Sequence, residues 1–578
     1  MCDAPDVAAL VARAEEWIAH DPAEATRTEL SAVVEAARRG DEAAAAVLAS
    51  RFSGPLTFGT AGLRGAVGAG ESRMNTAVVA RATAGLVRYL HDSLGEAGRP
   101  VVVLGCDARH GSTEFVRDAA RVVSGAGAEA IVLPERLPTP VLAFAVRHLG
   151  ADAGVMVTAS HNPPADNGYK VYLGGRLANN EACGVQIVPP ADADIASRIA
   201  QAPPADVIAR SSEFVTPAGD DVLRRYLDRA SGLRGSNESS PIRIVLTPMH
   251  GVGGETAVTA LAAAGFTDVH LVPEQADPDP DFPTVAFPNP EEPGALDLAL
   301  ALAKRVSADV VIALDPDADR CSVAIPVADG DPESASESAG GWRQLSGDEL
   351  GALLGEQAAS RAERDGRTGA LACSVVSGRL LARIAAAHGL EHATTLTGFK
   401  WIARTPDLLF GYEEAIGYCS DPDSVRDKDG ISAAVLVATL VDDLRREGRT
   451  LHNALDDLAR AHGLHATAPL TFRVDDVSII SDAMARLRAN PPTHLAGASV
   501  TSVVDLAEGH DGLPPTDGVL LLTDADDRVI VRPSGTEPKL KCYLEVVLDC
   551  PPHGTPPRAQ AEARLAALRE DVADSLAI

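Results

Sequence analysis

The chain has 578 residues, of which 46% are hydrophobic and 23% are charged, so it can bury large cores and is not a disordered protein. This length predicts about three or four domains. The formal net charge of −30 excludes a general nucleic-acid or anionic-membrane surface, because both need basic faces. It still allows a small anionic ligand, which needs only a local cluster of cations.

The cysteines and the apolar stretches exclude further classes of protein. The 8 cysteines are scattered without C-x-x-C spacing, which indicates neither a zinc site nor a disulfide framework. Residues 1–20 contain several acidic side chains and no apolar core, so no secretory signal is expected. The longest apolar stretches, such as 433–441, are too short to span a bilayer. We therefore expect a cytoplasmic protein with neither a membrane nor a nucleic acid as its partner.

Two amphipathic helices are predicted within residues 7–50, with a break at Asp21-Pro22. Beyond them, short apolar runs that end in polar or glycine-rich loops alternate with helical patterns, which predicts parallel βα units. Strands are predicted at 99–105, 130–133, 242–246, 308–314 and 370–376, and a helix at 114–123. After about residue 461 the pattern changes to Thr/Val-rich strands and ends in a helix near 557–576, which predicts a separate α+β module. Ligands of doubly wound sheets gather at the carboxyl ends of strands.

Residues 158–170 (TASHNPPADNGYK) form one loop of this kind, after the apolar run 155–157. The loop presents Ser160, which is compatible with an acyl-transfer nucleophile, a phosphoryl carrier or a simple turn residue. The acyl reading is the weakest, because no G-x-S-x-G is present. In addition, adjacent side chains on an extended chain point to opposite sides, so Ser160 and His161 should diverge.

Lysine is rare in this chain, and lysines stand only at positions 170, 304, 400, 428, 539 and 541. Arginine is a permanent charge, whereas a desolvated lysine amine can titrate. Lys170 and Lys400, which lie in glycine- and proline-rich loops, are therefore candidates for acid–base work.

Asp315, Asp317 and Asp319 directly follow a predicted strand. Alternating carboxylates in an extended segment project to one side, and three such oxygen ligands suit Mg²⁺. A calcium loop would need Gly and Glu where this chain has Arg320 and Pro326. An acidic turn without a metal is the remaining alternative.

Two further loops carry binding chemistry. Residues 532–539 (RPSGTEPK) offer a guanidinium fork, hydroxyls and an approachable backbone, which fit a phosphate or form an ordinary turn. Residues 411–418 (GYEEAIGY) hold Glu413 and Glu414, which fit a polyol ligand or a solvated acidic turn. Lys400, just upstream, is a candidate to reach the anionic end of a ligand. The absence of a Walker A sequence and of a complete dinucleotide fingerprint excludes NTPase and dehydrogenase readings.

Together, a presented serine, an acid triplet, a polyol loop and a phosphate loop describe phosphoryl transfer to a sugar. The assembly resembles the α-D-phosphohexomutase superfamily, in its phosphoglucomutase/phosphomannomutase branch, whose motifs occur in order at 58–65, 158–170, 315–320, 411–417 and 532–539. The resemblance implies an α/β fold: three related mixed- or parallel-sheet α/β domains around a cleft, plus a C-terminal TBP-like α+β domain. The expected domains are 1–215, 216–325, 326–460 and 461–578.

The resemblance also implies roles for individual residues. Ser160 would carry the phosphoryl group, and one Mg²⁺ per chain would be held by that phosphate and by the triplet Asp315, Asp317 and Asp319. The further catalytic residues would be Arg64, His161, Lys170 (the general base) and Arg320. The substrate would be bound by Lys400, Glu413, Glu414, Arg532, Ser534, Gly535, Thr536 and Lys539.

The implied reaction interconverts hexose 1-phosphate and hexose 6-phosphate, with glucose or mannose as the sugar, through a bound 1,6-bisphosphate. A glucose 1,6-bisphosphate-type activator and a monomer or homodimer are expected. Ala415 stands where many relatives have a serine, and the loop and the helical extension look closer to a phosphopentomutase-related branch. The alternative is therefore a mutase of ribose or deoxyribose 1- and 5-phosphates. A sugar-phosphate-binding protein that lost catalysis is disfavoured, because Ser160, Lys170 and the acid triplet are all present.

Overall fold

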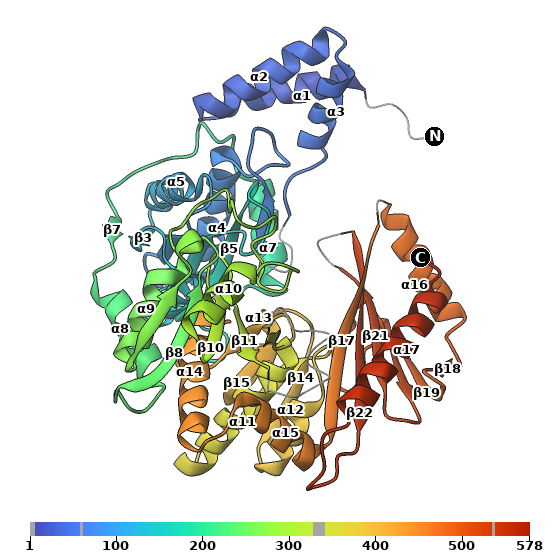
Figure 1. The fold of residues 1–578 in the computed structure, drawn as a ribbon. Coiled ribbons are helices and arrows are strands. Elements are labelled where there is room, and N and C mark those ends of the chain that lie inside the picture. Colours follow the sequence, from blue (N-terminus) through green and yellow to red (C-terminus); the bar gives the residue numbers. More distant parts are fainter. Residues whose placement is uncertain (1–5, 58–61, 328–340, 475, 535–537) are drawn as a thin grey trace.

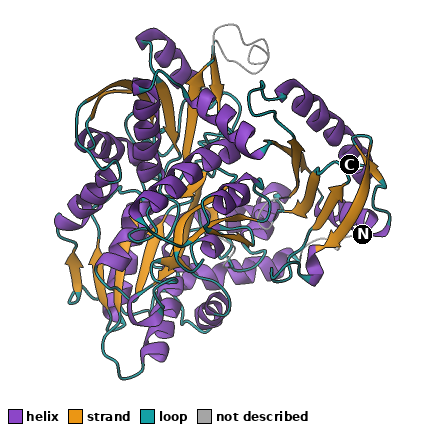
Figure 2. Ribbon diagram, turned by 90° about the horizontal axis from the view of Figure 1, so that it is seen from below, coloured by secondary structure: helices purple, strands orange, loops and turns teal. Residues whose placement is uncertain are grey.

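The structure is a computed structural model that describes residues 6–57, 62–327, 341–474, 476–534 and 538–578. Four β-sheets follow one another along the chain, and helices pack on their faces (Figure 1, Figure 2). The first three sheets mix parallel and antiparallel strands, whereas the fourth is antiparallel throughout. The predicted fold class is confirmed. The expected domain boundaries after residues 215, 325 and 460 stay predictions.

The amino-terminal part of the described chain has three helices rather than the predicted two: α1 (Val7–His20), α2 (Glu24–Arg38) and α3 (Glu42–Arg51). The additional break falls at Gly40, whose φ of 87° interrupts the helix. Asp41 then starts α3 by accepting hydrogen bonds from the backbone N–H groups of Ala43 and Ala44. These helices enclose a small core of their own at one end of the first sheet (Figure 1).

The first sheet positions the serine loop, and its strand order is β1-β5-β4-β2-β3-β7, with β6 beside β5. The strands are β1 (Leu63–Ala66), β2 (Val101–Cys106), β3 (Glu129–Val132), β4 (Ala153–Val157), β5 (Asp166–Leu173), β6 (Val185–Gln186) and β7 (Val215–Pro217). The accompanying helices are α4 (Thr76–Leu94), α5 (Ser112–Gly125), α6 (Thr139–His148), η1 (Gly175–Leu177) and α7 (Ala191–Ala200). Since β4 and β5 pair antiparallel, the serine loop is the connection between two neighbouring strands.

The second sheet has the order β12-β11-β10-β8-β9. Its strands are β8 (Ser240–Thr247), β9 (Phe266–Leu271), β10 (Val310–Leu314), β11 (Cys321–Pro326) and β12 (Trp342–Gln344). Its helices are α8 (Asp221–Gly232), α9 (Gly253–Ala263), η2 (Pro273–Gln275) and α10 (Asp297–Val306). Every residue of β10 is buried, as expected for a strand covered on both faces. The acid triplet begins where β10 ends.

The third sheet has the order β14-β13-β15-β16. Its strands are β13 (Ala370–Ser374), β14 (Glu391–Thr395), β15 (Leu408–Glu413) and β16 (Gly417–Cys419). The helices of this region are α11 (Gly347–Asp365), α12 (Leu380–Ala387), α13 (Phe399–Ile402), α14 (Gly430–Arg446) and α15 (Leu451–His462). Helix α14 follows this sheet in sequence but packs against α9, β8 and β10 of the second sheet, which ties the two units together (Figure 1).

The C-terminal module is a sheet of order β17-β22-β21-β20-β19-β18 with α16 and α17 on one face (Figure 1). Its elements are β17 (Leu464–Arg473), α16 (Val477–Ala489), β18 (His494–Leu495), β19 (Ala498–Asp505), η3 (Leu506–Glu508), β20 (Val519–Thr523), β21 (Arg528–Pro533), β22 (Lys539–Leu548) and α17 (Arg558–Leu576). The predicted final helix is thus confirmed. Across the ranges described above, no helix combines the length and the apolarity that crossing a membrane requires.

A buried ion cluster attaches this module to the third sheet. Glu545 of β22 is 1% exposed and accepts hydrogen bonds from Arg379 Nε (2.7 Å) and the Arg379 backbone N–H (2.7 Å). It also lies 3.0 Å from Arg528 Nε and 3.1 Å from His465 Nδ1. Burial by itself raises the pKa of Glu545. The neighbouring arginines and His465 lower this pKa by more than burial raises it, so the carboxylate stays ionised. The chain at Arg532, four residues after Arg528, is therefore held at a defined place.

Candidate active site

Ser160 lies in the connection between β4 and β5, where the chain reverses direction. Its φ is 53°, a left-handed conformation that is uncommon for a residue with a side chain, and its backbone N–H donates to Thr158 Oγ1 over 2.9 Å. The Arg109 guanidinium holds the loop by donating to the carbonyl oxygens of Ser160 (2.7 Å), Pro163 (2.8 Å) and Asp166 (3.0 Å). Ser160 is only 3% exposed, so this residue lies in the interior, and Arg109 fixes the loop that carries it.

The three carboxylates converge through a turn and not through the extended segment that we expected. Ala318 has a φ of 54° and donates its N–H to the Asp315 carbonyl oxygen over 2.8 Å. Proline at the second position of such a turn is favourable, which is why Pro316 bends the chain here. One oxygen from each of Asp315, Asp317 and Asp319 lies within 4.8 Å of the others.

The serine and the triplet share one site, because Ser160 Oγ donates a hydrogen bond to Asp315 Oδ2 over 2.7 Å. The two residues are 155 positions apart in the sequence and belong to different sheets. Both are buried, so the contact is shielded from bulk water.

The donor set fits a divalent metal ion. Asp317 and Asp319 each keep Oδ1 buried without a hydrogen-bond partner among the described residues. Buried polar atoms are normally paired, because an unpaired one costs free energy. Thr139 Oγ1 (2.6 Å) and Lys170 Nζ (2.8 Å) both donate to the other oxygen, Oδ2 of Asp317. Several carboxylate oxygens aimed at one point are the ligands that Mg²⁺ takes.

Two lysines neutralise the triplet. Lys170 Nζ, on β5, donates to Asp319 Oδ2 over 3.0 Å, and Lys428 Nζ lies 3.4 Å from the same oxygen. Burial lowers the pKa of Lys170, but Asp317 and Asp319 outweigh it, so its pKa is raised. Burial likewise raises the pKa of Asp319, but Lys170 and Lys428 bring it below its ordinary value. Asp315 lacks such a partner, and its pKa lies well above the ordinary value because of burial and the two neighbouring carboxylates.

Arg64 and His161 border the serine loop. Arg64, on β1, donates from Nη1 to Asn162 Oδ1 over 2.8 Å. His161 Nδ1 lies 3.2 Å from Ser160 Oγ, so the expected divergence of these side chains was wrong; the left-handed turn at Ser160 replaces the extended chain. Burial, with the charges of Arg320 and Arg64, lowers the pKa of His161 well below its ordinary value, so the ring is neutral.

Residues 414–416 join β15 to β16 and reach the loop of the triplet. Arg320 forms a β-bridge with Gly417, and Cys321 N–H donates to the Ile416 carbonyl oxygen over 3.1 Å. The Arg320 guanidinium lies 3.9 Å from Asp319 Oδ1 and also interacts electrostatically with Glu413. This cation therefore interacts with carboxylates of both loops.

The two glutamates of that loop differ in their surroundings. Glu414 Oε2 accepts hydrogen bonds from the hydroxyls of Ser374 and Ser377, both over 3.1 Å, which turns this carboxyl toward the third sheet. Burial, followed by the charges of Glu413 and Asp348, raises the pKa of Glu414 to about 7. Glu413 has no such hydroxyl partner among the described contacts.

The phosphate loop is described in part. Arg532 on β21 stands opposite Lys541 on β22, and Ser534 N–H donates to the Lys539 carbonyl oxygen over 2.8 Å. Gly535 and Thr536 lie outside the described residues, as do the first four residues of the motif 58–65. Arg532 Nε is buried without a hydrogen-bond partner in the described chain, and Lys541 acts electrostatically on Glu414. Lys541, which pairs with Arg532 across the two strands, therefore lies within electrostatic reach of the sugar loop.

Lys400 lies in α13 and is 8% exposed. Burial lowers its pKa, and its charged neighbours are Asp192 and Arg404. The structure thus places Lys400 near Asp192 of α7, whereas Lys428 is the lysine that joins Lys170 at the carboxylates.

Three residues of the site were missed by the sequence analysis: Arg109, Thr139 and Lys428. Lys428 is one of the few lysines of the chain, and the rarity of lysine could have indicated it as a site residue. Arg109 follows strand β2 at its carboxyl end, which was also a usable signal. Thr139 lies at the start of α6, and no pattern in its neighbourhood indicated a contact with Asp317.

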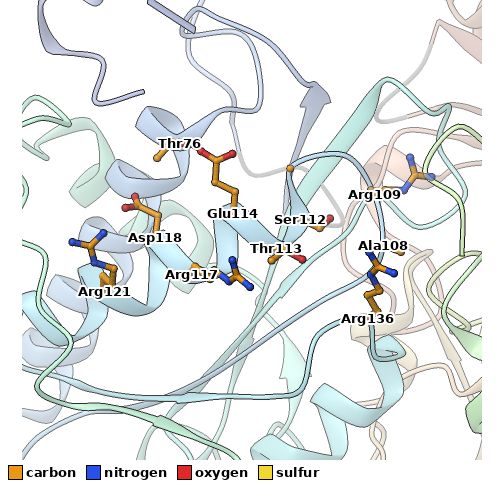
Figure 3. Close-up of a pocket in the computed structure, with 11 residues that line it drawn as sticks. Thr76, Ala108, Arg109, Ser112, Thr113, Glu114, Arg117, Asp118, Arg121 and Arg136 are labelled. Atoms are coloured by element: carbon orange, nitrogen blue, oxygen red, sulfur yellow. Dashed lines mark hydrogen bonds between the residues drawn. The ribbon is translucent and has the colours of Figure 1, made fainter. Parts of the chain in front are cut away.

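A cavity of about 650 Å³ opens along α5, on the outer side of the segment that carries Arg109 (Figure 3). Its charged side chains pair with neighbours: Thr76 Oγ1 donates to Glu114 (3.2 Å), and Arg117 Nη2 to Glu135 Oε1 (2.6 Å). Arg109 is turned away from Arg121 in this view, toward the serine loop. The cavity does not include Ser160 or the triplet.

Family models match the chain in order. Phosphoglucomutase/phosphomannomutase alpha/beta/alpha domains I, II and III match residues 55–202, 224–328 and 346–462, and the C-terminal domain matches 500–549. The chain belongs to the phosphoglucomutase/phosphomannomutase family. Members of this family are mutases, intramolecular phosphotransferases of the isomerase class.

Curated relatives carry several related names. The chain is 44% identical over 475 residues to a probable phosphomannomutase of Haemophilus influenzae, which covers 82% of this chain and 93% of that protein. It is 35% identical over 560 residues to the phosphopentomutase of Homo sapiens (89% and 88%). It is 31% identical over 528 residues to a phosphoglucomutase of Staphylococcus aureus (86% and 91%).

Solved structures share the fold. A putative phosphomannomutase from Thermus thermophilus matches with a TM-score of 0.66 and 24% identity, over 90% of this chain and 99% of that one. A phosphoglucomutase from Paramecium matches with a TM-score of 0.65 and 18% identity, over 91% and 96%.

We expect the stability of the protein to depend on the ionisation of Glu414. Its folded-state pKa of about 7 lies above the ordinary 4.5. The protonated carboxyl therefore contributes its full stabilisation of the fold below about pH 4.5, and this contribution is lost as the pH rises through about 7. The free energy of unfolding of the wild type minus that of the Glu414→Gln variant should therefore be smaller at about pH 8 than at about pH 5. Urea denaturation of both proteins at the two pH values measures this; a difference that does not change with pH contradicts it.

We expect Mg²⁺ to raise the midpoint of thermal unfolding of the wild type. A ligand that binds only the folded state at about 100 times its Kd adds about 2.7 kcal/mol. Asp317→Asn should remove most of this shift, whereas Asp505→Asn, which removes a partner of Arg488 in the C-terminal module, should keep it. An equal Mg²⁺ shift in all three proteins contradicts a metal site at the triplet.

Proposed function

We propose that this protein interconverts hexose 1-phosphate and hexose 6-phosphate, with glucose or mannose as the sugar, by passing a phosphoryl group through Ser160. The observation that carries the proposal is the 2.7 Å contact of Ser160 Oγ with Asp315 Oδ2 in a buried site. Membership of the family supports the reaction class. A cytoplasmic location and a monomeric or homodimeric state belong to the same proposal.

The residues around Ser160 would prepare the transfer. Mg²⁺, one ion per chain, would be held by the triplet and the Ser160 phosphate, and would neutralise charge on the transferring group. The guanidinium groups of Arg64 and Arg320 would donate to phosphate oxygens, and neutral His161 would stabilise Oγ without adding a charge. Arg109 fixes the loop, so the attacking oxygen does not have to be ordered at each turnover.

Lys170 is the proposed general base for the sugar hydroxyl. Its partners Asp317 and Asp319 keep it protonated, so the role requires that their negative charge be neutralised first. Its burial then disfavours the charged form, which is how a lysine amine becomes a base.

The far end of the substrate would be held by three loops. Glu413 and Glu414 would accept from sugar hydroxyls, with Glu414 also fixing the loop through Ser374 and Ser377. Lys400 would reach the anionic end of the ligand. The phosphate that is not reacting would be bound by Arg532, Ser534, Gly535, Thr536 and Lys539. The 1,6-bisphosphate would turn around in the site, and a glucose 1,6-bisphosphate-type activator would phosphorylate Ser160.

A pentose phosphate is the second candidate substrate. It is favoured by the 35% identity to the human phosphopentomutase and by Ala415, which removes a hydroxyl from the sugar loop. Values of kcat/KM on glucose 1-phosphate, mannose 1-phosphate and ribose 1-phosphate decide between the two. We expect a hexose phosphate to give the highest value; a preference for ribose 1-phosphate selects the second candidate.

We expect Ser160→Ala to reduce turnover to background, because no other side chain carries the phosphoryl group in this scheme. The thermal midpoint should stay close to that of the wild type, and intact-mass analysis should show a phosphate adduct on the wild type but not on the variant. Ser197→Ala, on the exposed side of α7, is the control and should keep both activity and adduct. Near-normal turnover of Ser160→Ala overturns the proposed function.

A further inference from the structure

A proline-rich segment, residues 277–296, joins η2 to α10 and contacts both the first unit and the C-terminal module. Near its start, Asp281 Oδ1 lies 2.7 Å from Nε2 of His110, the residue after the arginine that holds the serine loop. Near its end, Arg473 Nη2 of the C-terminal module lies 3.6 Å from Glu292 Oε1. Two surface contacts therefore connect this segment to the first unit and to the C-terminal module.

Glu291 of this segment faces the site. Its Oε2 lies 3.6 Å from Arg320 Nη1, and its backbone N–H donates to Asn289 Oδ1 over 3.2 Å. The preceding carbonyl oxygen, of Pro290, accepts from Gln344 Nε2 over 2.8 Å. Hydrogen bonds on both sides of its peptide fix the backbone and so the direction of this side chain.

The surroundings of Glu291 come from three loops. Burial, with the charge of Glu413, raises the pKa of Glu291 above its ordinary value, although Arg320 and Lys541 oppose this shift, so all three charges act on its carboxyl. The side chain is nevertheless 36% accessible to solvent. A carboxyl that lies beside Arg320, within electrostatic reach of Glu413 and Lys541, and is open to water can contact a ligand held between the triplet loop and the sugar loop.

We propose that Glu291 accepts a hydrogen bond from a hydroxyl of the sugar and contributes to the choice of sugar; this inference rests on the proposed function. An ionised carboxylate only accepts, and sugar hydroxyls donate. In the sugar loop, Glu414 already accepts from two serine hydroxyls, and Ala415 has no polar side-chain atom. Glu291, which lies 3.6 Å from Arg320 Nη1 in the segment before α10, supplies a further acceptor from a different part of the chain.

A hydroxyl recognised in this way gives selectivity. A site built to hydrogen-bond a hydroxyl discriminates against an analogue whose hydroxyl is missing or misplaced, because the protein group is then left unpaired. Glucose 1-phosphate and mannose 1-phosphate differ only in the direction of one hydroxyl, and ribose 1-phosphate has a different ring. A contact to one hydroxyl therefore changes the ratio of rates among the three.

The test compares Glu291→Gln with Glu292→Gln, its neighbour, which faces Arg473. For each protein, kcat and KM are measured on glucose 1-phosphate, mannose 1-phosphate and ribose 1-phosphate. Phosphorylation of Ser160 is followed by intact mass, and folding by the thermal midpoint. We expect Glu291→Gln to raise KM for the best substrate and to change the ratio of kcat/KM between sugars by about tenfold. Glu292→Gln should keep that ratio, and Glu291→Asp should restore part of it.

Two results overturn the inference. If Glu291→Gln lowers activity equally on all three sugars, Glu291 only holds Arg320. If it changes the ratio no more than Glu292→Gln does, Glu291 does not contact the sugar. If the wild type has no mutase activity and no phosphate on Ser160, the proposed function itself is wrong. The kinetics and intact mass of the wild type distinguish this outcome from the two results above.

Discussion

Three carboxylates buried beside one serine hydroxyl are the constraint on which the rest of the site depends. Like charges this close repel strongly when water is excluded, and burying them is costly unless they are paired. The chain meets this cost with Lys170 and Lys428 on Asp319, and with hydrogen bonds from Ser160 and Lys170 to the other members. Oδ1 of Asp317 and Oδ1 of Asp319 have no hydrogen-bond partner among the described residues, and a bound cation would stabilise both oxygens.

This arrangement requires all four units of the fold. The hydroxyl and Lys170 come from the first sheet, the triplet from the second, and Lys428 from the segment between the third sheet and α14. The C-terminal module carries Arg532 and Lys541, and its position relative to the third sheet is set by Glu545 with its arginine partners. A partly charged interface of this kind is specific in geometry, because one misplaced partner leaves a buried charge unpaired.

Three residues in left-handed backbone conformations lie in the loops of the site. Ser160, Ala318 and Ile416 all have side chains and φ values of 53–54°, and they lie in the serine loop, the triplet loop and the sugar loop respectively. Such conformations persist only where surrounding contacts hold them, as Arg109 holds the first and the hydrogen bond from Cys321 N–H holds the third. The left-handed conformation turns the Ser160 hydroxyl toward both Asp315 and His161, which an extended chain does not allow.

What the sequence determined by itself was the alternation of strands and helices, several of the strands and the chemical groups in the loops after them, because hydrophobic periodicity and turn residues are local properties. Ser160, the triplet and Lys170 were found in this way. Only the tertiary structure decided that Lys428 reaches Asp319, that Glu414 turns toward Ser374 and Ser377, and that Glu291 faces Arg320. These contacts join residues from different parts of the chain, and which of two chemically equal side chains meets a partner depends on the packing of the sheets, which no local pattern records.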